Sequence, residues 1–279
     1  MLNKKYILKV GITDEKAKTI LESVFELLKK DKKFFIVTPN PEIVVYATKH
    51  PSYEKVLNRA EIALADGIGL FVAGKILGKS LAERFTGVDF IENLCMKSKD
   101  QPISIGFLGG RSGIAEKAAE CLQAKYPWIE VVFASDEWSE PGFTGSVEAR
   151  STHQEARAHS IEEEGRGGKK PTSPVHHVEP NHAPTIDLLF VAFGAPKQEE
   201  WIAENLEKLP IKAAMGVGGS LDFISGEVKR APAWVRGIGL EWFFRLVLQP
   251  WRWKRQMALL EFLWLVLKAS FGKPQNDHV

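Results

Sequence analysis

Cysteine is nearly absent from this sequence of 279 residues. The two that occur, Cys95 and Cys121, each fall in a segment whose pattern predicts a helix. Two isolated thiols cannot form the disulfide framework of a small secreted domain, nor the spaced cysteine pairs of a structural zinc site. The cysteine content is therefore typical of a protein from a reducing cytosol.

The sequence also lacks any apolar run of about 18 residues, the length that a membrane-spanning helix needs. Even the stretch from Met257 to Leu267 is interrupted by Glu261. The N-terminus begins Met-Leu-Asn-Lys-Lys-Tyr and has no uninterrupted apolar core of a secretory signal. We therefore expect a cytoplasmic protein that does not span a membrane.

A strong net charge is missing as well, because the formal value is only +2. Most of the chain is not basic enough to follow a nucleic-acid duplex, so we expect no nucleic-acid partner. The charge is instead uneven: residues 226–279 carry nine Lys or Arg against four Asp or Glu, and five of the eight tryptophans. This combination predicts an amphipathic helical appendage that meets an anionic membrane surface.

Apolar strand-like runs alternate with helical patterns from the N-terminus to about residue 136. The pattern predicts helices at 17–28 and 114–126, a helix that begins at Pro41 with Asn40 as its cap, and strands at 34–37, 62–65, 103–108 and 129–134. Such alternation is typical of an α/β fold with a Rossmann-like parallel sheet flanked by helices.

The alternation stops between residues 137 and 184, where Gly, Pro, Ser, Glu and Arg dominate. Such a composition predicts a disordered or loosely ordered insertion. Five of the seven histidines lie in it, but their spacing matches no standard zinc-ligand pattern, so we expect no metal site. The alternation resumes with a strand at 188–193, a helix from Pro196 to about Leu209 and a strand at 212–217. The sequence thus predicts a sheet domain over 1–225 and an appendage over 226–279, broken at Gln249-Pro250.

Polar residues and glycines follow several of the predicted strands. In a parallel sheet the carboxyl ends of the strands meet at one edge, so the segments Thr38 to Asn40, Asp66-Gly67, Gly109 to Gly113, Gly194 to Gln198 and Gly216 to Ser220 are expected in one pocket. Asp66 is the candidate general base, since a carboxylate at a strand end can reach a substrate hydroxyl. An Asp-Gly turn in which the carboxylate bonds only backbone amides explains the same residue equally well.

The other polar groups of this pocket suit an uncharged or phosphorylated ligand. Thr38, Asn40 and Gln198 offer neutral hydrogen bonds of the kind that sugar hydroxyls accept. The run Gly109-Gly110-Arg111-Ser112-Gly113 resembles the dinucleotide fingerprint, with Asp136 after the next strand as a ribose ligand, but Leu108 stands where its first glycine belongs. A nicotinamide-dependent oxidoreductase is therefore a weaker alternative.

The stretch from Met215 to Arg236 joins a glycine-rich strand end to the basic tail. Backbone at Gly218 and Gly219 can approach an anionic ligand closely, and the cations that follow can neutralise its charge. Arg245, Arg252 and Arg255 are spaced seven and three residues apart, which on a continuous helix gives roughly one face. Their guanidinium groups suit a leaving diphosphate, and contact with lipid phosphates is the alternative.

Six motifs taken together identify a family. They are Thr38-Pro39-Asn40, Ala65-Asp66-Gly67, Arg84-Phe85-Thr86-Gly87-Val88-Asp89, Phe107-Leu108-Gly109-Gly110, Phe193 to Glu199 and Gly216-Val217-Gly218-Gly219-Ser220. In this order they resemble the WecG/TagA/CpsF family of bacterial glycosyltransferases over nearly all of the chain except the insertion. The family's glycine-aromatic segment after the 129–134 strand is replaced by Ser135-Asp136-Glu137-Trp138 and the polar insertion, which puts the local packing there in doubt.

The resemblance implies an inverting, metal-independent transferase that needs no cofactor. Its best-known members move N-acetylmannosamine, or its uronic acid, from UDP to a polyprenyl-diphosphate-linked sugar at the inner face of the plasma membrane, for a cell-surface polysaccharide or teichoic acid. Relatives also imply self-association away from the membrane. By motif, Asp66 resembles the catalytic base, and the residues expected to bind substrate are Thr38, Asn40, Arg84, Gly109, Gly110, Gln198, Gly218, Gly219, Arg245, Arg252 and Arg255. A non-catalytic nucleotide- or lipid-binding protein is the remaining alternative.

Overall fold

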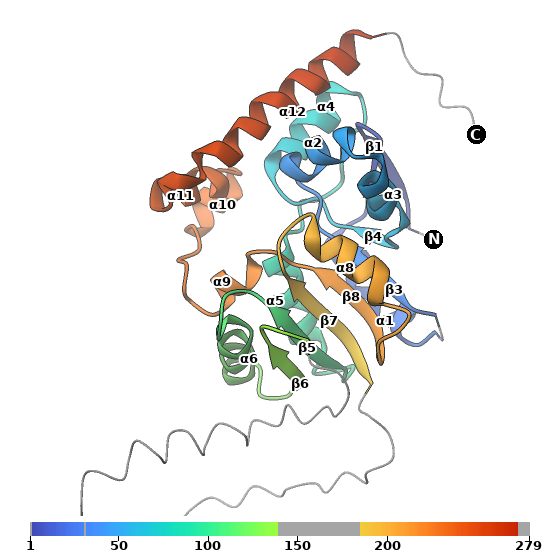
Figure 1. Ribbon diagram of the computed structural model, residues 1–279, viewed down its shortest axis with the longest axis vertical. Coiled ribbons are helices and arrows are strands. Elements are labelled where there is room, and N and C mark those ends of the chain that lie inside the picture. The colour runs from blue at the N-terminus through green and yellow to red at the C-terminus, as the bar shows by residue number, and fades with distance from the viewer. Residues whose placement is uncertain (1, 31, 139–184, 273–279) are drawn as a thin grey trace, which may run out of the picture.

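A parallel sheet forms the centre of the molecule (Figure 1). The computed structural model describes residues 2–30, 32–138 and 185–272. Its sheet has six strands in the order β4-β3-β8-β7-β5-β6, and every neighbouring pair is parallel. The strands are β3 (Phe34–Val37), β4 (Ile62–Ala63), β5 (Ser104–Gly109), β6 (Glu130–Ser135), β7 (Ile186–Ala192) and β8 (Ile211–Gly216). The predicted α/β class is confirmed.

Helices cover both faces of the sheet, which explains why its strands are almost continuously apolar. Side chains alternate between the faces, so Phe34 and Ile36 pack on one side while Phe35 and Val37 pack on the other. The first face is covered by α1 (Ala17–Leu28), α5 (Gly87–Lys97), α6 (Ile114–Lys125) and the short α9 (Ser220–Ile224). The second is covered by α2 (Pro41–Lys49), α3 (Pro51–Arg59), α4 (Ile68–Ile76) and α8 (Lys197–Asn205).

The predicted cap of α2 is present. The side-chain oxygen of Asn40 accepts a hydrogen bond from the Ile43 amide at 3.0 Å, and Pro41 occupies the first turn, where its missing N–H costs nothing. This cap fixes the direction in which α2 leaves β3. It therefore fixes the position of the polar loop from Thr38 to Asn40 at the edge of the sheet.

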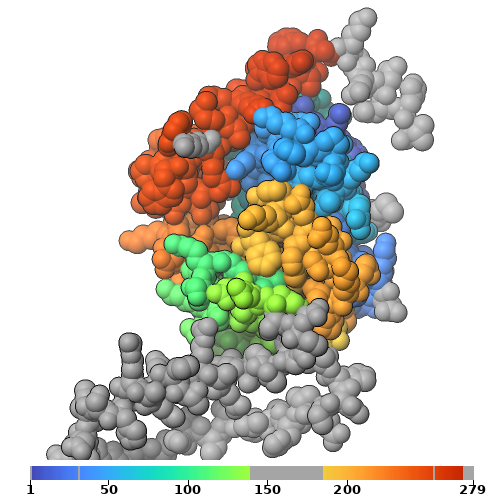
Figure 2. All heavy atoms as spheres, viewed as in Figure 1, coloured from blue at the N-terminus to red at the C-terminus, as the bar shows by residue number. Residues whose placement is uncertain are grey.

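The C-terminal segment is a chain of helices that covers one end of the molecule (Figures 1 and 2). It consists of α10 (Ala233–Gly237), α11 (Glu241–Leu248), the 3-10 turn η2 (Pro250–Arg252) and α12 (Trp253–Phe271), with the break at Gln249-Pro250 that the sequence predicts. The helix α12 lies across α2 and α4, and its Phe262 and Val266 are buried there with the core of the second face. No helix in the described part of the chain is long and apolar enough to cross a membrane.

Several local predictions differ from the structure. The N-terminal residues form a hairpin of β1 (Lys4–Ile7) and β2 (Val10–Thr13) that the sequence analysis does not anticipate. β4 ends at Ala63 instead of residue 65. α8 ends at Asn205 instead of about Leu209, because residues 206–210 form the turn that leads into β8. Residues 139–184 of the expected insertion, with their five histidines, lie outside the described residues. The domain division at residue 225 stays a prediction.

Candidate active site

A cleft of about 750 Å³ lies at the carboxyl edge of the sheet. The loops after β3, β4, β5, β7 and β8 all contribute to its lining, and α11, η2 and α12 form the opposite wall. Ligands of parallel α/β proteins bind at this edge because loops and helix N-termini converge there. The prediction that five strand ends meet in one pocket is thus confirmed in geometry.

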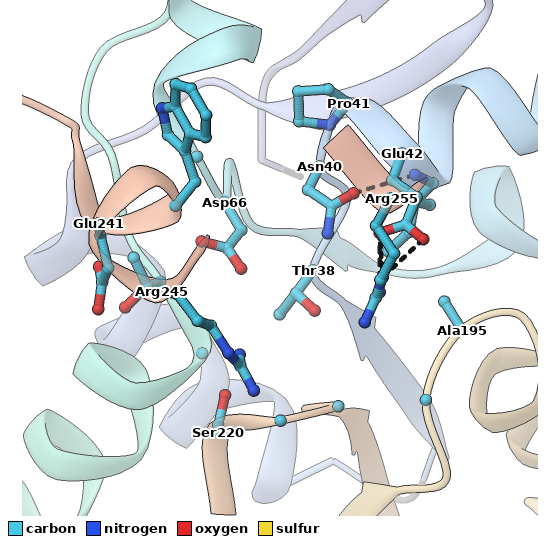
Figure 3. A pocket seen from close by; sticks show the side chains of 18 of the residues that line it. Thr38, Asn40, Pro41, Glu42, Asp66, Ala195, Ser220, Glu241, Arg245 and Arg255 are labelled. Carbon is cyan, nitrogen blue, oxygen red and sulfur yellow. Dashed lines mark hydrogen bonds and ion pairs between the residues drawn. The ribbon is translucent and has the colours of Figure 1, made fainter. Parts of the chain in front are cut away.

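Asp66 lies at the centre of this cleft (Figure 3). Its backbone amide donates to the carbonyl of Pro39 at 3.0 Å, which ties the end of β4 to the loop after β3. Gly67 follows with φ +92°, a conformation that glycine adopts without strain. Among the described residues, no group donates a hydrogen bond to the Asp66 carboxylate, so the side chain does not close an Asp-Gly turn and instead faces the cleft.

The surroundings of Asp66 favour a base that works near neutral pH. Removal from water and, to a lesser degree, the negative charge of Glu241 raise the pKa of its carboxyl to about 7, against the opposing effect of the Arg84 guanidinium. The residue itself is half-buried because it faces the cleft. A carboxylate of this pKa binds a proton far better than an ordinary aspartate, which is what general-base catalysis near pH 7 requires.

The side-chain oxygens of Thr38 and Asn40 form hydrogen bonds within the protein. The Thr38 hydroxyl donates to the carbonyl of Gly216 at 3.0 Å and so links β3 to β8. The Asn40 oxygen is used by the helix cap, as described above, while its amide nitrogen points into the cleft (Figure 3). The cap and the ligand contact that are both expected of Asn40 are therefore compatible, because each uses a different atom of its side chain.

Gln198 holds two loops of the cleft together. Its side-chain oxygen accepts from the amides of Gly194 at 3.1 Å and Gly218 at 2.9 Å. Its nitrogen donates to the buried carboxylate of Glu199 at 2.7 Å, and the Tyr53 hydroxyl donates to the other Glu199 oxygen at 2.9 Å. Burial raises the pKa of Glu199 and of Tyr53. Gln198 lines the cleft as predicted, but most of its hydrogen-bonding capacity positions backbone.

The three predicted arginines lie on three different elements and still reach the same cleft. Arg245 is on α11, Arg252 is on η2 and Arg255 is on α12, so the break at Pro250 does not separate them. Desolvation, with Arg245 and Arg255 nearby, lowers the pKa of Arg252 to about 10. Cations crowded in this way repel one another, and an anionic ligand would relieve that repulsion.

Two of these arginines already have acidic partners. Arg255 makes a bidentate pair with Glu42 of α2, with N–O distances of 2.7 to 3.0 Å (Figure 3). Arg245 lies 3.5 Å from the Asp222 carboxylate and over the ring of Phe223. A Cβ atom on Gly219 would come within 2.9 Å of the Arg245 guanidinium, so a larger residue there would displace this cation from the loop.

Arg84 and the motif around it connect the sheet to the C-terminal helices. The Arg84 guanidinium lines the cleft and donates to the carbonyl of Arg236 at 2.6 Å. Arg230 donates to Asp89 at 2.7 Å and to Glu241 at 3.3 Å. These contacts fix α10 and α11 against the start of α5, so Glu241 and Arg245 keep their places opposite Asp66.

The glycines of the β5 loop have two different positions. Gly110 lines the cleft, whereas Gly109 lies behind it, where a side chain would meet the ring of Phe193 at 2.7 Å. Gly218 and Gly219 line the cleft, and the Gly218 amide is held by Gln198. A ligand contact of Gly109 stays a prediction.

Arg111 lines the cleft as part of the segment from Gly109 to Gly113 that is expected there. Glu42, Asp222 and Glu241 also line it but are not expected from the sequence, because no local motif marks them and only the fold brings them to the site. Within residues 2–30, 32–138 and 185–272, no group of three His, Cys, Asp or Glu side chains is placed to hold a metal ion.

Comparison with known proteins agrees with this geometry. The model of the family "Glycosyl transferase WecG/TagA/CpsF family" matches residues 5–276. Three similar proteins carry the name N-acetylglucosaminyldiphosphoundecaprenol N-acetyl-beta-D-mannosaminyltransferase. The one from Bacillus spizizenii is 33% identical over 86% of this chain and 81% of its own length. The one from Bacillus subtilis is 31% identical over 87% and 85%, and one from Staphylococcus aureus is 32% identical over 85% and 80%. The chain therefore belongs to the WecG/TagA/CpsF family of glycosyl transferases.

Proposed function

We propose that the protein transfers N-acetylmannosamine, its uronic acid or a related hexose from UDP to a sugar on a polyprenyl diphosphate, with inversion at the anomeric carbon. The names of its relatives support this substrate class, since they describe transfer of N-acetylmannosamine to N-acetylglucosaminyldiphosphoundecaprenol. The observation that carries the proposal is one cleft that holds the Asp66 carboxylate, with its raised pKa, opposite three arginines.

In the proposed reaction Asp66 removes the proton from an acceptor hydroxyl. The hydroxyl oxygen forms a bond to the anomeric carbon of the donor from the face opposite UDP, and the bond from that carbon to the UDP oxygen breaks. The leaving diphosphate then carries the additional negative charge. Arg245, Arg252 and Arg255 are placed to stabilise this charge because guanidinium groups bind phosphate oxygens in pairs.

We further propose that the reaction needs no metal ion or other cofactor. In many phosphate-transferring sites a divalent cation neutralises the leaving group. Three guanidinium groups at one end of the cleft supply the same kind of charge without a metal. Addition of a chelator should therefore leave turnover unchanged.

The proposed acceptor is anchored in a membrane, so the protein must work at a membrane surface. We place it on the inner face of the plasma membrane, held there by the exposed aromatic and basic groups of its C-terminal helices. Self-association away from the membrane stays a prediction. The alternatives of an oxidoreductase and of a non-catalytic binding protein are not favoured, because the relatives are transferases.

The test is Asp66→Asn, which keeps the size of the side chain and removes the base. We expect transfer to fall by about 10²- to 10⁴-fold, the usual effect of a general base. UDP should still raise the melting temperature, because the arginines are intact. Product mass with a panel of UDP-sugars and a short lipid diphosphate sugar measures transfer and also identifies the donor.

The matched control is Asp136→Asn. Asp136 also follows a strand but does not line the cleft, so the transferase hypothesis expects unchanged turnover. Full activity of Asp66→Asn would remove Asp66 from its role. Stabilisation by NADH and not by UDP would instead favour the oxidoreductase, and Asp136 would then be its ribose ligand.

A further inference from the structure

The cleft extends beyond the arginines into an apolar groove. It continues between α4 and α12, where no charged side chain lines it beyond Arg255. The six apolar groups of this groove are Val72 and Ala73 on α4, and Leu259, Phe262, Leu263 and Val266 on α12. The α12 residues recur every three or four positions and so form one face of that helix. We call these six residues the α4–α12 groove.

The side chains at the base of the groove are buried, and those at its rim are exposed to solvent. Phe262 and Val266 are 4% and 0% exposed because they pack into the core beside α2. Val72 and Leu263, on opposite walls, are 45% and 42% exposed. Exposed apolar side chains that line a continuous depression mark a binding surface for hydrocarbon more often than isolated ones do.

Polarity changes in one direction from the end of η2 along α12. Arg252, Arg255 and Gln256 line the cleft at the start of this segment, and only apolar side chains line it from Leu259 to Val266. Arg255 and Val266 are separated by about 16 Å at the rise of about 1.5 Å per residue. A ligand that fits this surface carries an anionic group at one end and a hydrocarbon chain at the other.

The α4 wall links the groove to the reacting end of the cleft. Asp66 lies two residues before the start of α4, and Ile68, Gly69, Val72 and Ala73 continue the lining along that helix. The sugar of a ligand that lies along α4 would meet Asp66 while its tail extends toward Val72. The UDP-sugar has no hydrocarbon chain, so the donor does not need this surface.

We propose that the α4–α12 groove binds the first isoprene units of the acceptor's polyprenyl chain. The proposal rests on the proposed function, because it assumes an acceptor with a lipid diphosphate. It adds that the enzyme contacts the first part of the lipid directly, in addition to the sugar that the membrane-bound acceptor presents. The groove thus contributes to acceptor specificity, and the outer face of α12 is left to meet the membrane.

The test compares two acceptors with the same sugar diphosphate, one with a short water-soluble prenyl chain and one with a methyl group. Both are assayed without vesicles or detergent, so partition into a membrane cannot contribute. For the full-length protein we expect a higher kcat/KM with the prenyl acceptor. Leu263→Gln and Val72→Asn should each lower the ratio of the two kcat/KM values by about tenfold, since a polar amide would then face hydrocarbon.

Leu260→Gln is the matched control, because Leu260 is 64% exposed on the same helix but does not line the cleft. Its ratio of kcat/KM values should equal that of the unmodified protein. Equal kcat/KM for both acceptors in the unmodified protein would overturn the groove proposal, and so would a ratio that neither wall variant changes. Absence of transfer to both acceptors would instead contradict the proposed function, so the two failures are distinguishable.

Discussion

The most informative single residue is Asp66, whose environment would couple the proposed catalysis to pH. Because its carboxyl pKa is raised to about 7, the base is largely protonated in mildly acidic solution. We expect kcat/KM to rise about tenfold per pH unit below pH 7 and to level off above it. Glu241→Gln removes a negative charge that raises this pKa, so the midpoint should move to lower pH. Unchanged midpoints in that variant would show that Glu241 does not act on Asp66.

The same shift makes a prediction about stability. A carboxyl whose pKa is higher in the folded state than in the unfolded chain favours folding at low pH, and this contribution is lost as the pH rises from about 4 to about 7. Asp66→Asn should therefore melt at a higher temperature than the unmodified protein at pH 8, and the difference should vanish near pH 4. Thermal melts at both pH values measure it. A less stable variant at pH 8 would contradict the raised pKa.

At the scale of elements, two ion pairs join α2 to α12. Glu42 pairs with Arg255, and Lys49 pairs with Glu261 at 2.7 Å. Both pairs are substantially exposed, so each contributes little to stability. Only the pair of Glu42 with Arg255 involves an arginine that lines the cleft, so only this pair is expected to affect ligand binding. Under the proposed function, Glu42 would therefore compete with the donor diphosphate for Arg255 and would also place a negative charge beside it.

Glu42→Gln should strengthen UDP binding by about three- to tenfold, since one competing charge is removed. Isothermal titration calorimetry gives the dissociation constant directly. Glu261→Gln breaks the other pair between the same two helices, without touching the cleft, and should leave the dissociation constant unchanged. Weaker UDP binding in both variants would mean that the pairs act by holding α12 in place.

Local patterns predict most of the elements because their causes are local. The buried strands β3, β5, β7 and β8 are found within two residues of their predicted bounds, and the cap by Asn40 is present. The β1–β2 hairpin is missed because its turn uses Leu8 and Lys9 at positive φ, without the glycine or asparagine that marks such a turn.

The site is predicted where it depends on strand ends and missed where it depends on contacts between distant segments. Thr38, Asp66 and Gln198 follow strands, so the topology of a parallel sheet brings them together. The pair of Glu42 with Arg255 joins residues 213 positions apart, and no local pattern announces it. The commitment of Gln198 to Glu199 and to two backbone amides likewise becomes visible only in three dimensions.

At the scale of the whole molecule, the C-terminal helices present apolar side chains both inward and outward. Trp234, Trp251 and Phe271 are 72%, 71% and 87% exposed, and none of them lines the cleft. Tryptophan favours the headgroup layer of a membrane, where its ring is apolar and its N–H remains hydrated. The inner face of α12 completes the cleft, so the same helices would hold the membrane and the reaction site at a fixed separation.

The vesicle experiment tests this arrangement without removing a helix that contributes to the core. A double variant, Trp234→Ser with Trp251→Ser, should bind anionic vesicles at least about tenfold more weakly, because two large aromatic groups no longer enter the interface. Met96→Ser is the control: Met96 is 55% exposed near the end of α5, ten residues beyond Thr86 at the cleft, and should not affect sedimentation with vesicles. Turnover of the double variant with a soluble acceptor should match the unmodified protein. Undiminished vesicle binding would place the membrane contact elsewhere on the molecule. Loss of both vesicle binding and turnover with the soluble acceptor would show that these tryptophans support the cleft itself.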